Sequence, residues 1–561
     1  MTRVLLLIFA CEWMMTAAPR LILTHETVQE LRRISATKGS AHASMLDLLK
    51  RKVDGAKIAA GDNYGKAYQA TSAAFLFQMT KEARYCEVAW QSLQQVYAGA
   101  NSDSLLPDQG YGLARATVGS GFAYAYDWCG EAWSEDQKSW VAAKLRAGLD
   151  SWPRFRHANV EAAHKGSNWV AVCRGGELIE MIALGLEKER AERYALIKAD
   201  LHRHMQNMDE LGVSQEGIGY TAYGGIFLLR AILALRSIGD HDLDAEASRH
   251  AWWKQAMYSG TFALAPNGGR IWMMSGVSGP GIGDEGWASL LFAFTPKDQL
   301  PYFQWWYDRH MGRFAPGSEE LRFDPRREGQ VWAMICYPAN TPERDPSPVF
   351  PKAIVESGGL ALFRNRWQDA DDILISMHAD AKWHSHAWDQ PEALQWHVFA
   401  YGRSFAGGPE KTRDAANFTT LLVDGRYGTA KGAGAIMSFG VHKDGGMISV
   451  DGGSQYERLG VAVTRTMKVD FLGGNRARIG MSDRIRGTQP HVYTWQINVG
   501  DHASDGGLRR SGNKLESARG VMNIDIIRPP GAELQGSDPI RLNASGESIE
   551  IEVEMELRPK N

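Results

Sequence analysis

The chain has 561 residues, of which 44% are hydrophobic and 23% charged, and its formal net charge is −3. This composition is typical of a globular protein long enough for more than one domain, and it excludes a disordered or collagen-like chain. The near-zero net charge removes the strongly basic surface expected of a nucleic-acid-binding protein. The 19 tryptophans favour either large hydrophobic cores or flat faces on which sugar rings stack.

The first residues of the chain predict an export signal. Arg3 precedes the apolar run 4–10, and the small residues 16–18 follow it. This order is typical of a secretory signal over residues 1–18, and the apolar run is too short to span a bilayer. Cys11, directly after the run, loosely resembles a bacterial lipoprotein anchor. We therefore expect a periplasmic or secreted protein without a transmembrane segment.

The cysteines are few and widely spaced. Their spacing predicts neither a zinc knuckle nor a dense disulfide framework, and it leaves the redox compartment open. The five are Cys11, Cys86, Cys129, Cys173 and Cys336.

Residues 19–345 read as successive helices. A capping box at 134–137 precedes Trp140, Val141 and Leu145, whose spacing places them on one helical face. Some later patterns are apolar nearly all round, which is typical of helices buried on several sides. We therefore expect an α/α toroid, an incomplete helical barrel, over residues 19–345. The further helical patterns cover residues 179–186, 194–208, 226–238 and 252–264.

A proline-rich bridge at residues 338–351 precedes a change of period from helical spacing to alternation. Residues 548–557 alternate apolar and polar side chains without a fault, as a strand with one solvated face does. Helices followed by strands predict two domains of an α+β protein, the second an antiparallel β-sandwich over residues 350–561. The other strand candidates are residues 373–377, 419–423, 461–471, 492–499 and 521–527.

Two segments of the helical half carry candidate site residues. His164, Asn168 and Trp169 place an imidazole, an amide and an indole at a helix entrance. Further along, Glu216 precedes Tyr220 and Tyr223, which would share a face of a helix because they are three residues apart. Glycines beside the two tyrosines allow a backbone or a ligand to approach closely.

The densest group of reactive side chains in the second half is the segment 383–389. Trp383 precedes His384 and His386, which would face the same way on a strand and so suit a metal ion or a substrate. A lone His-x-His is a weak metal motif and is often a polar surface. His397 and His442 are additional, weaker candidates.

These segments together resemble the heparinase II/III-like polysaccharide lyases, a family that joins an α/α toroid to an antiparallel β-sandwich. The likeness is spread over most of the chain. The resemblance implies that Tyr220 and His384 are the catalytic acid/base pair and that Asn168 belongs to the catalytic site. The segments that carry it are Asn168 with Trp169, Glu216 to Tyr220, the strand 359–364 with Trp367, His384 to His386, and the strand 420–425.

The sequence departs from the family pattern at three places. Asp389 lies three residues after His386, where the family commonly has an Asp two residues on. Residues 404–408 replace a segment that often holds a metal-binding Asp. Trp169 stands where many relatives have His, so the substrate contacts differ. A structural zinc ion bound by His386 and His442 is therefore only a secondary expectation, and no organic cofactor is required.

The chemistry implied is β-elimination on a uronate sugar. A base removes the C5 proton, the C4 oxygen leaves, and neutral hydrogen-bond donors aimed at the carboxylate stabilise the enolate-like state. A phenol does acid or base work when its pKa of about 10 is lowered by its surroundings. We expect an acidic polysaccharide or oligosaccharide as substrate. The substrate-binding candidates are His164, Trp169, Glu216, Tyr223 and Trp383.

Two other functions compete with the lyase. A glycoside hydrolase on an α/α toroid needs two carboxylates across the scissile bond, which Glu216 with Asp284 or Glu285 would supply. A non-catalytic glycan-binding protein is the third reading. Arginines are usually solvated, so they discriminate poorly. The arginine candidates for contact with an acidic glycan chain are Arg174, Arg270, Arg313, Arg364 and Arg366.

Overall fold

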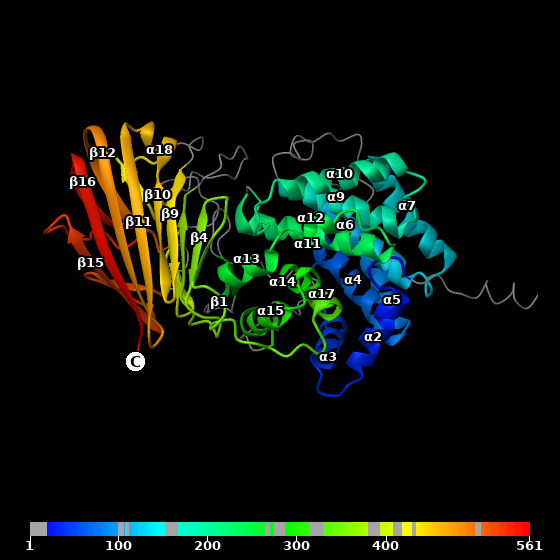
Figure 1. Ribbon diagram of the computed structural model, residues 1–561. Coiled ribbons are helices and arrows are strands. Elements are labelled where there is room, and N and C mark those ends of the chain that lie inside the picture. The colour runs from blue at the N-terminus through cyan, green and yellow to red at the C-terminus, as the bar shows by residue number, and fades with distance from the viewer. Residues whose placement is uncertain are drawn as a thin grey trace, which may run out of the picture.

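The computed structural model is an α+β protein with a helical part followed by antiparallel sheets (Figure 1). The helices gather on one side and the sheets stand on the other, with α13 and the β4 sheet where the two parts meet. The structure describes residues 19–98, 106, 112–151, 167–214, 216–263, 270–273, 286–313, 329–379, 393–407, 418–428, 434–499 and 507–560.

The helical part ends at Cys336. Its α-helices are α2 (His25–Ser35), α3 (Ala41–Asp54), α4 (Asn63–Thr80), α5 (Arg84–Ala98), α6 (Leu113–Cys129), α7 (Glu135–Ser151), α9 (Asn168–Ala183), α10 (Ala191–Gln206), α11 (Gly217–Ser237), α12 (Asp244–Ala247), α13 (Trp252–Ser259), α14 (Trp287–Leu290), α15 (Leu300–Trp306) and α17 (Gly329–Cys336). A 3-10 turn, η3 (Leu291–Phe294), follows α14, and a π-helical turn, η4 (Tyr307–Met311), follows α15.

Side-chain caps fix where several of these helices begin. At the start of α7 the Ser134 hydroxyl accepts from the Gln137 backbone N–H, and the Gln137 side chain accepts from the Ser134 N–H. This reciprocal pair is the expected capping box. The hydroxyls of Thr24 and Ser40 cap α2 and α3 without the reciprocal bond, by accepting from the backbone N–H of Thr27 and of Ala43. Local sequence therefore sets these boundaries.

The helices pack as neighbours around a ring. Contacts run from α4 to α6, α9, α11, α14 and α17 in turn, and α3 touches both α17 and α4. The side-chain amide of Gln330 on α17 donates to the Met45 carbonyl on α3 at 3.3 Å. Helices α3 and α17, from the two ends of the helical part, therefore lie against each other.

Helix α11 is a buried, strongly apolar member of this ring. Among the described residues it is the one helix long and apolar enough to cross a membrane, but 83% of its most apolar window is buried inside the protein. Burial on nearly all sides explains its continuous apolar sequence, since the helix packs against other helices instead of lipid.

The predicted helix over residues 252–264 is wrong at its end. Helix α13 stops at Ser259, and Gly260–Ala263 forms strand β1, paired antiparallel with β2 (Arg270–Met273). Gly260 takes an extended conformation, with φ −97° and ψ 135°. Glycine and the β-branched Thr261 are weak helix formers, so the apolar spacing alone overestimated the helix.

The remaining strands form two antiparallel sheets. The first has the order β3-β4-β5-β6-β7, and the second has the order β13-β14-β15-β16-β12-β11-β10-β9 with β8 beside β12. A short helix, α18 (Gly453–Glu457), precedes β11. The strands are β3 (Ala353–Val355), β4 (Leu360–Arg364), β5 (Leu374–His378), β6 (Trp396–Ala400), β7 (Arg403–Ala406), β8 (Leu421–Val423), β9 (Ala435–His442), β10 (Gly445–Asp451), β11 (Val461–Leu472), β12 (Arg476–Ile497), β13 (Arg509–Ser511), β14 (Lys514–Glu516), β15 (Gly520–Arg528) and β16 (Ile540–Pro559).

The two sheets share one hydrophobic core. Trp396 of β6 stacks on Trp495 of β12 with ring centroids 5.6 Å apart, and residues from both sheets fill the layer between them. Along β16 the buried residues from Ile551 to Leu557 alternate with half-buried glutamates. The alternation predicted from the sequence is therefore the division between the core and the outer face.

Arg364 of β4 ties the sheets to the helical part. Its fully buried guanidinium donates to the carbonyls of Met257 and Gly260 at 2.7 Å and to Asp372 at 2.9 Å. The indole of Trp367 also donates to the Met257 carbonyl at 2.7 Å. These buried bonds fix the first sheet against the end of α13, because each would leave an unpaired polar group if the parts separated.

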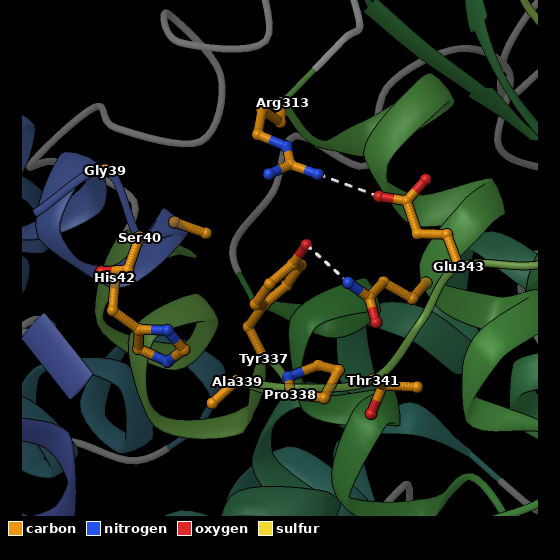
Figure 2. Close-up of a pocket in the computed structure, with 11 residues that line it drawn as sticks. Gly39, Ser40, His42, Arg313, Tyr337, Pro338, Ala339, Thr341 and Glu343 are labelled. Atoms are coloured by element: carbon orange, nitrogen blue, oxygen red, sulfur yellow. Dashed lines mark hydrogen bonds and ion pairs between the residues drawn. The ribbon is translucent and has the colours of Figure 1, made fainter. Parts of the chain in front are cut away.

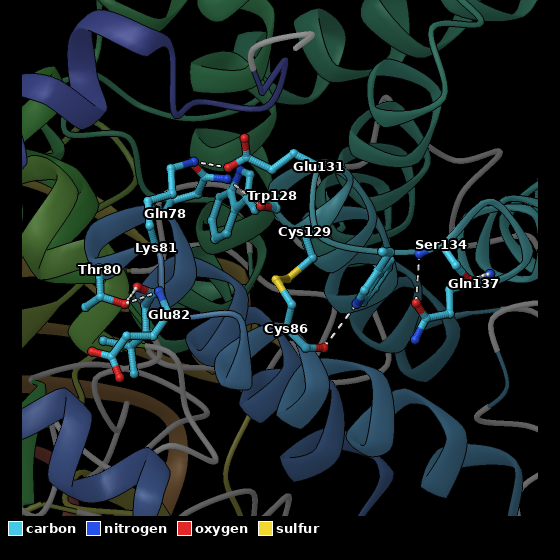
Figure 3. The surroundings of a disulfide bond; sticks show 12 residues. Gln78, Thr80, Lys81, Glu82, Cys86, Trp128, Cys129, Glu131, Ser134 and Gln137 are labelled. Carbon is cyan, nitrogen blue, oxygen red and sulfur yellow. Dashed lines mark hydrogen bonds and ion pairs between the residues drawn. A yellow bond between two sulfur atoms is a disulfide. The ribbon is translucent and has the colours of Figure 1, made fainter.

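A disulfide bond joins α5 to α6 between Cys86 and Cys129 (Figure 3). The indole of Trp133 donates to the Cys86 carbonyl at 3.0 Å, beside the capping box of α7. Of the two free cysteines among the described residues, Cys173 is buried and Cys336 is half-buried, and burial raises the pKa of the Cys336 thiol to about 12. The sequence did not indicate which cysteines pair.

Candidate active site

Asn168 and Glu216 meet at the N-terminal ends of α9 and α11. Ser167 caps α9, so Asn168 is the first helical residue, and Glu216 immediately precedes α11. The Glu216 Oε2 atom accepts from both the backbone N–H and the side-chain Nδ2 of Asn168, each at 2.6 Å. Both residues are buried. The sequence named both as candidates, and the structure brings them into direct contact.

The bond to Glu216 fixes the orientation of the Asn168 amide. An ionised carboxylate only accepts hydrogen bonds, so the NH₂ group of Asn168 must face it. The Asn168 Oδ1 atom therefore points elsewhere, and it is buried without a hydrogen-bond partner. Buried polar atoms are nearly always paired, so this acceptor is free to receive a hydrogen bond from water or from a ligand.

Tyr220 lies one turn into α11, where burial, and after it the charge of Glu216, raises the pKa of the phenol. This is opposite in direction to the lowered pKa that a phenolic base needs. The neighbourhood within the described residues therefore keeps Tyr220 protonated at neutral pH. A protonated phenol is suited to giving a proton away.

Tyr223 and Trp169 are half-buried beside this cluster. The ring of Tyr223 packs edge to face on Phe227 with centroids 6.3 Å apart. A Cβ on Gly112 would lie 3.1 Å from the ring of Trp169, so this indole covers the start of α6. Trp169 follows Asn168 at the start of α9 and Tyr223 lies in the second turn of α11, and their substrate-binding roles stay predictions.

The glycines near the tyrosines serve helix packing. A Cβ on Gly224 would lie 3.1 Å from the Ala171 Cβ and 3.3 Å from the Asn168 Cβ, and one on Gly175 would lie 2.8 Å from the Phe227 carbonyl oxygen. Helices α9 and α11 therefore approach closely, and this approach holds Asn168 against Glu216.

Several predicted residues lie outside the described part of the chain, so their positions stay predictions. These are His164, Asp284, Glu285, Trp383, His384, His386 and Asp389.

The zinc expectation gains no support from the residues that can be placed. His442 ends β9 at the surface, with its Nε2 atom 3.4 Å from Asp470 Oδ1. Within the described ranges there is no group of three or more His, Cys, Asp or Glu side chains able to hold a metal ion. His397 is buried between Ser376 and Gln395, at 3.1 Å from each, and burial holds its pKa well below the usual value. His397 is therefore a neutral core residue.

The arginines considered for glycan contact are engaged elsewhere where the structure describes them. Arg174 pairs with Glu177 and Asp200, and Arg366 pairs with Asp369 and Asp372. Arg364 is the buried link described above. Arg313 belongs to a separate cavity, and nothing is described of the side chain of Arg270.

The helical toroid followed by antiparallel sheets defines the structural class of the protein. No family model matches the chain, and no curated protein matches it in sequence. Solved structures do match in fold. A heparan sulfate lyase mutant from Pedobacter heparinus superimposes with a TM-score of 0.55 at 10% identity, covering 89% of this chain and 76% of that one.

Two further structures share the arrangement. A heparinase III gene product gives a TM-score of 0.52 at 10% identity, covering 88% of this chain and 76% of its own. A xanthan lyase from Paenibacillus gives 0.51 at 10% identity, covering 97% of this chain and 60% of its own. At this identity the likeness establishes the fold, which confirms the predicted architecture.

Proposed function

We propose that the protein is a polysaccharide lyase that cleaves a uronate-containing glycan by β-elimination. The observation that carries the proposal is the cluster of Asn168, Glu216 and Tyr220 at the ends of α9 and α11. The fold shared with solved heparan sulfate and xanthan lyases supports it.

In the proposed reaction Tyr220 is the acid. A base takes the proton from C5, the C4–O4 bond breaks, a double bond forms between C4 and C5, and the phenol of Tyr220 protonates the departing oxygen. The raised pKa keeps that proton in place until the oxygen leaves. The resemblance implies His384 as the acid/base partner of Tyr220 without saying which of the two takes the proton; in this proposal His384 is the base, and water afterwards restores the proton of Tyr220.

The Asn168–Glu216 pair is suited to binding the carboxyl group of the substrate uronate. Beyond the hydrogen given to Glu216, the Asn168 amide retains one N–H and its unpaired oxygen. A donor and an acceptor side by side complement a neutral carboxylic acid, and the charge of Glu216 opposes a second carboxylate there. We therefore assign to this pair the binding of the uronate in its protonated form, which makes the C5 proton more acidic.

Nothing in the described residues favours the hydrolase alternative. Glu216 is buried and accepts two hydrogen bonds from Asn168, which is the environment of a positioning carboxylate. The carboxylates proposed as its partners lie outside the described residues. The proposed lyase needs no organic cofactor, and no step in it passes through a metal ion.

We further propose a periplasmic or secreted location, with residues 1–18 as the signal, 19–345 as the toroid domain and 350–561 as the sandwich domain. The Cys86–Cys129 disulfide supports export, because disulfides persist mainly in oxidising compartments.

The proposed function is tested by incubating the purified protein with a panel of uronate polysaccharides. Elimination creates a double bond conjugated to the carboxyl group, which absorbs in the ultraviolet, whereas hydrolysis creates only reducing ends. We expect absorbance to rise with at least one polymer. New reducing ends with flat absorbance would instead indicate a hydrolase.

A further inference from the structure

A polar cavity lies between the start of α3 and the C-terminal end of α17 (Figure 2). Its volume is about 410 Å³, within the range of small-molecule sites. Its walls come from the residues before and within α3, from α15, and from the segment after α17. The cavity is therefore at the C-terminal end of α17, whereas the candidate active site is at the N-terminal ends of α9 and α11.

The cavity contains an unmet hydrogen-bond acceptor. The Tyr337 hydroxyl donates to Asp308 Oδ2 at 2.6 Å and accepts from Gln304 Nε2 at 2.9 Å. Because the nitrogen of Gln304 is directed at the phenol, its Oε1 atom faces away. That oxygen is buried without a hydrogen-bond partner in a residue only 5% exposed that lines the cavity. An O–H or N–H donor, from a ligand or from a water molecule that a ligand displaces, satisfies it.

The charges around the cavity balance. Glu343 accepts from Arg309 at 2.8 Å and from Arg313 at 2.9 Å, and Arg313 also reaches Asp308 at 3.2 Å. Figure 2 shows Arg313 and Glu343 joined at one rim, with His42 on the opposite wall. Burial lowers the pKa of His42, so its ring is neutral. The charged side chains that line the cavity are thus one guanidinium group, Arg313, paired with one carboxylate, Glu343, and this pairing favours a neutral ligand over an ion.

We propose that this cavity binds a neutral saccharide unit. A sugar hydroxyl donates to Gln304 Oε1, and other hydroxyls exchange hydrogen bonds with Thr341 and Glu343, while the Tyr337 ring supplies an apolar wall. Adjacent donors and acceptors on a neutral, compact frame match the mixed lining. This inference does not depend on the lyase proposal, because the sugar bound here is not the one cleaved.

The experiment uses the full chain and neutral sugars that contain no uronate, such as glucose, galactose, maltose and cellobiose. Saturation-transfer NMR and calorimetry measure their binding to the wild type, to Gln304→Met and to Thr341→Val. The control is Gln330→Met, since Gln330 is also a buried glutamine with an unpaired Oε1 but does not line the cavity. Sulfate and tetramethylammonium are the charged probes.

We expect at least one neutral sugar to bind, and Gln304→Met and Thr341→Val each to weaken it about three- to tenfold, the value of one lost hydrogen bond. Gln330→Met should bind as the wild type does. If Gln304→Met fails to fold, Thr341→Val alone decides, because it changes one partly exposed hydroxyl. The proposal is overturned if no sugar binds, if both cavity variants bind normally, or if only a charged probe binds. None of these outcomes bears on the absorbance assay of the lyase.

Discussion

Asn168 and Gln304, two of the buried side-chain amides of the helical part, have different partners. Asn168 and Gln304 each direct the NH₂ group at a neighbour and leave the amide oxygen unpaired. At Asn168 the neighbour is a carboxylate held by amide hydrogens. At Gln304 it is a phenol, and the nearby carboxyl groups are held by guanidinium groups. The first centre therefore keeps a negative field suited to proton transfer, whereas the second is balanced and suited to a neutral ligand.

The largest effect that tests this difference is expected from Asn168→Asp. A second carboxylate against Glu216 removes the donor and adds repulsion, so we expect kcat/KM to fall about 10²- to 10³-fold at pH 7. Lowering the pH should restore part of the lost kcat/KM, because the two carboxylates can then share a proton. A pH profile of the absorbance assay checks this, with Asn168→Ala as the control that acid should not rescue. Equal recovery of both variants would contradict the role given to Glu216.

A smaller effect is expected from Glu216→Gln. The variant side chain still accepts from Asn168 but no longer carries the charge that raises the pKa of Tyr220. We expect about a tenfold loss of kcat and an acid shift of the basic limb of the kcat profile. Glu246→Gln, at a buried glutamate on α12, is the matched control and should change neither. An unchanged pH profile for Glu216→Gln would show that its charge does not act on Tyr220.

The smallest effect concerns the free energy of unfolding of the protein and depends on Asp308, beside the Gln304 cavity. Burial, and after it the Glu343 carboxylate, raises the pKa of Asp308 to about 7. A raised pKa in the folded state means that this stabilisation is complete below the unfolded value of about 4 and is lost as pH rises through 7. Between pH 5 and 7 the Asp308 contribution to the free energy of unfolding should fall by at most about 1.4 kcal/mol per pH unit.

Denaturant unfolding of Asp308→Asn measures that contribution by difference. Buried His204, His378 and His397 have lowered pKa values, so their contributions fall as pH drops below about 6.5, in the opposite direction. These histidine contributions are the same in the wild type and in Asp308→Asn, so they cancel in the difference between the two proteins. We expect the difference in free energy of unfolding between the wild type and Asp308→Asn to become smaller from pH 5 to pH 7. A difference that stays constant would mean that Asp308 is ionised throughout this range.

Much of the fold could be predicted because its signals are local. The capping box at Ser134 and the alternation in β16 each depend on residues within a few positions of one another. The end of α13 was predicted wrongly, because the apolar spacing continues past Gly260 whereas the backbone becomes extended there. The pairing of Cys86 with Cys129 was not predictable, since it depends on how α5 packs on α6.

The candidate site was predicted only in part for the same reason. Motif spacing identified Asn168, Glu216 and Tyr220, but the direct bond between Asn168 and Glu216 arises from the close approach of α9 and α11 at Gly224. The direction of the pKa shift of Tyr220 depends first on burial, which tertiary packing sets and local sequence does not show. The cavity at Gln304 joins segments about 300 residues apart, and no local signal marks it.

The central claim is that the Asn168–Glu216–Tyr220 cluster performs the elimination, and Tyr220→Phe tests it most directly. The initial rate of absorbance increase is compared for the wild type, Tyr220→Phe and Tyr126→Phe, the last a half-buried tyrosine on α6 outside the cluster. Loss of the acid predicts at least about a thousandfold lower rate for Tyr220→Phe and a nearly unchanged rate for Tyr126→Phe. A Tyr220→Phe protein that forms the unsaturated product at the wild-type rate would contradict the account.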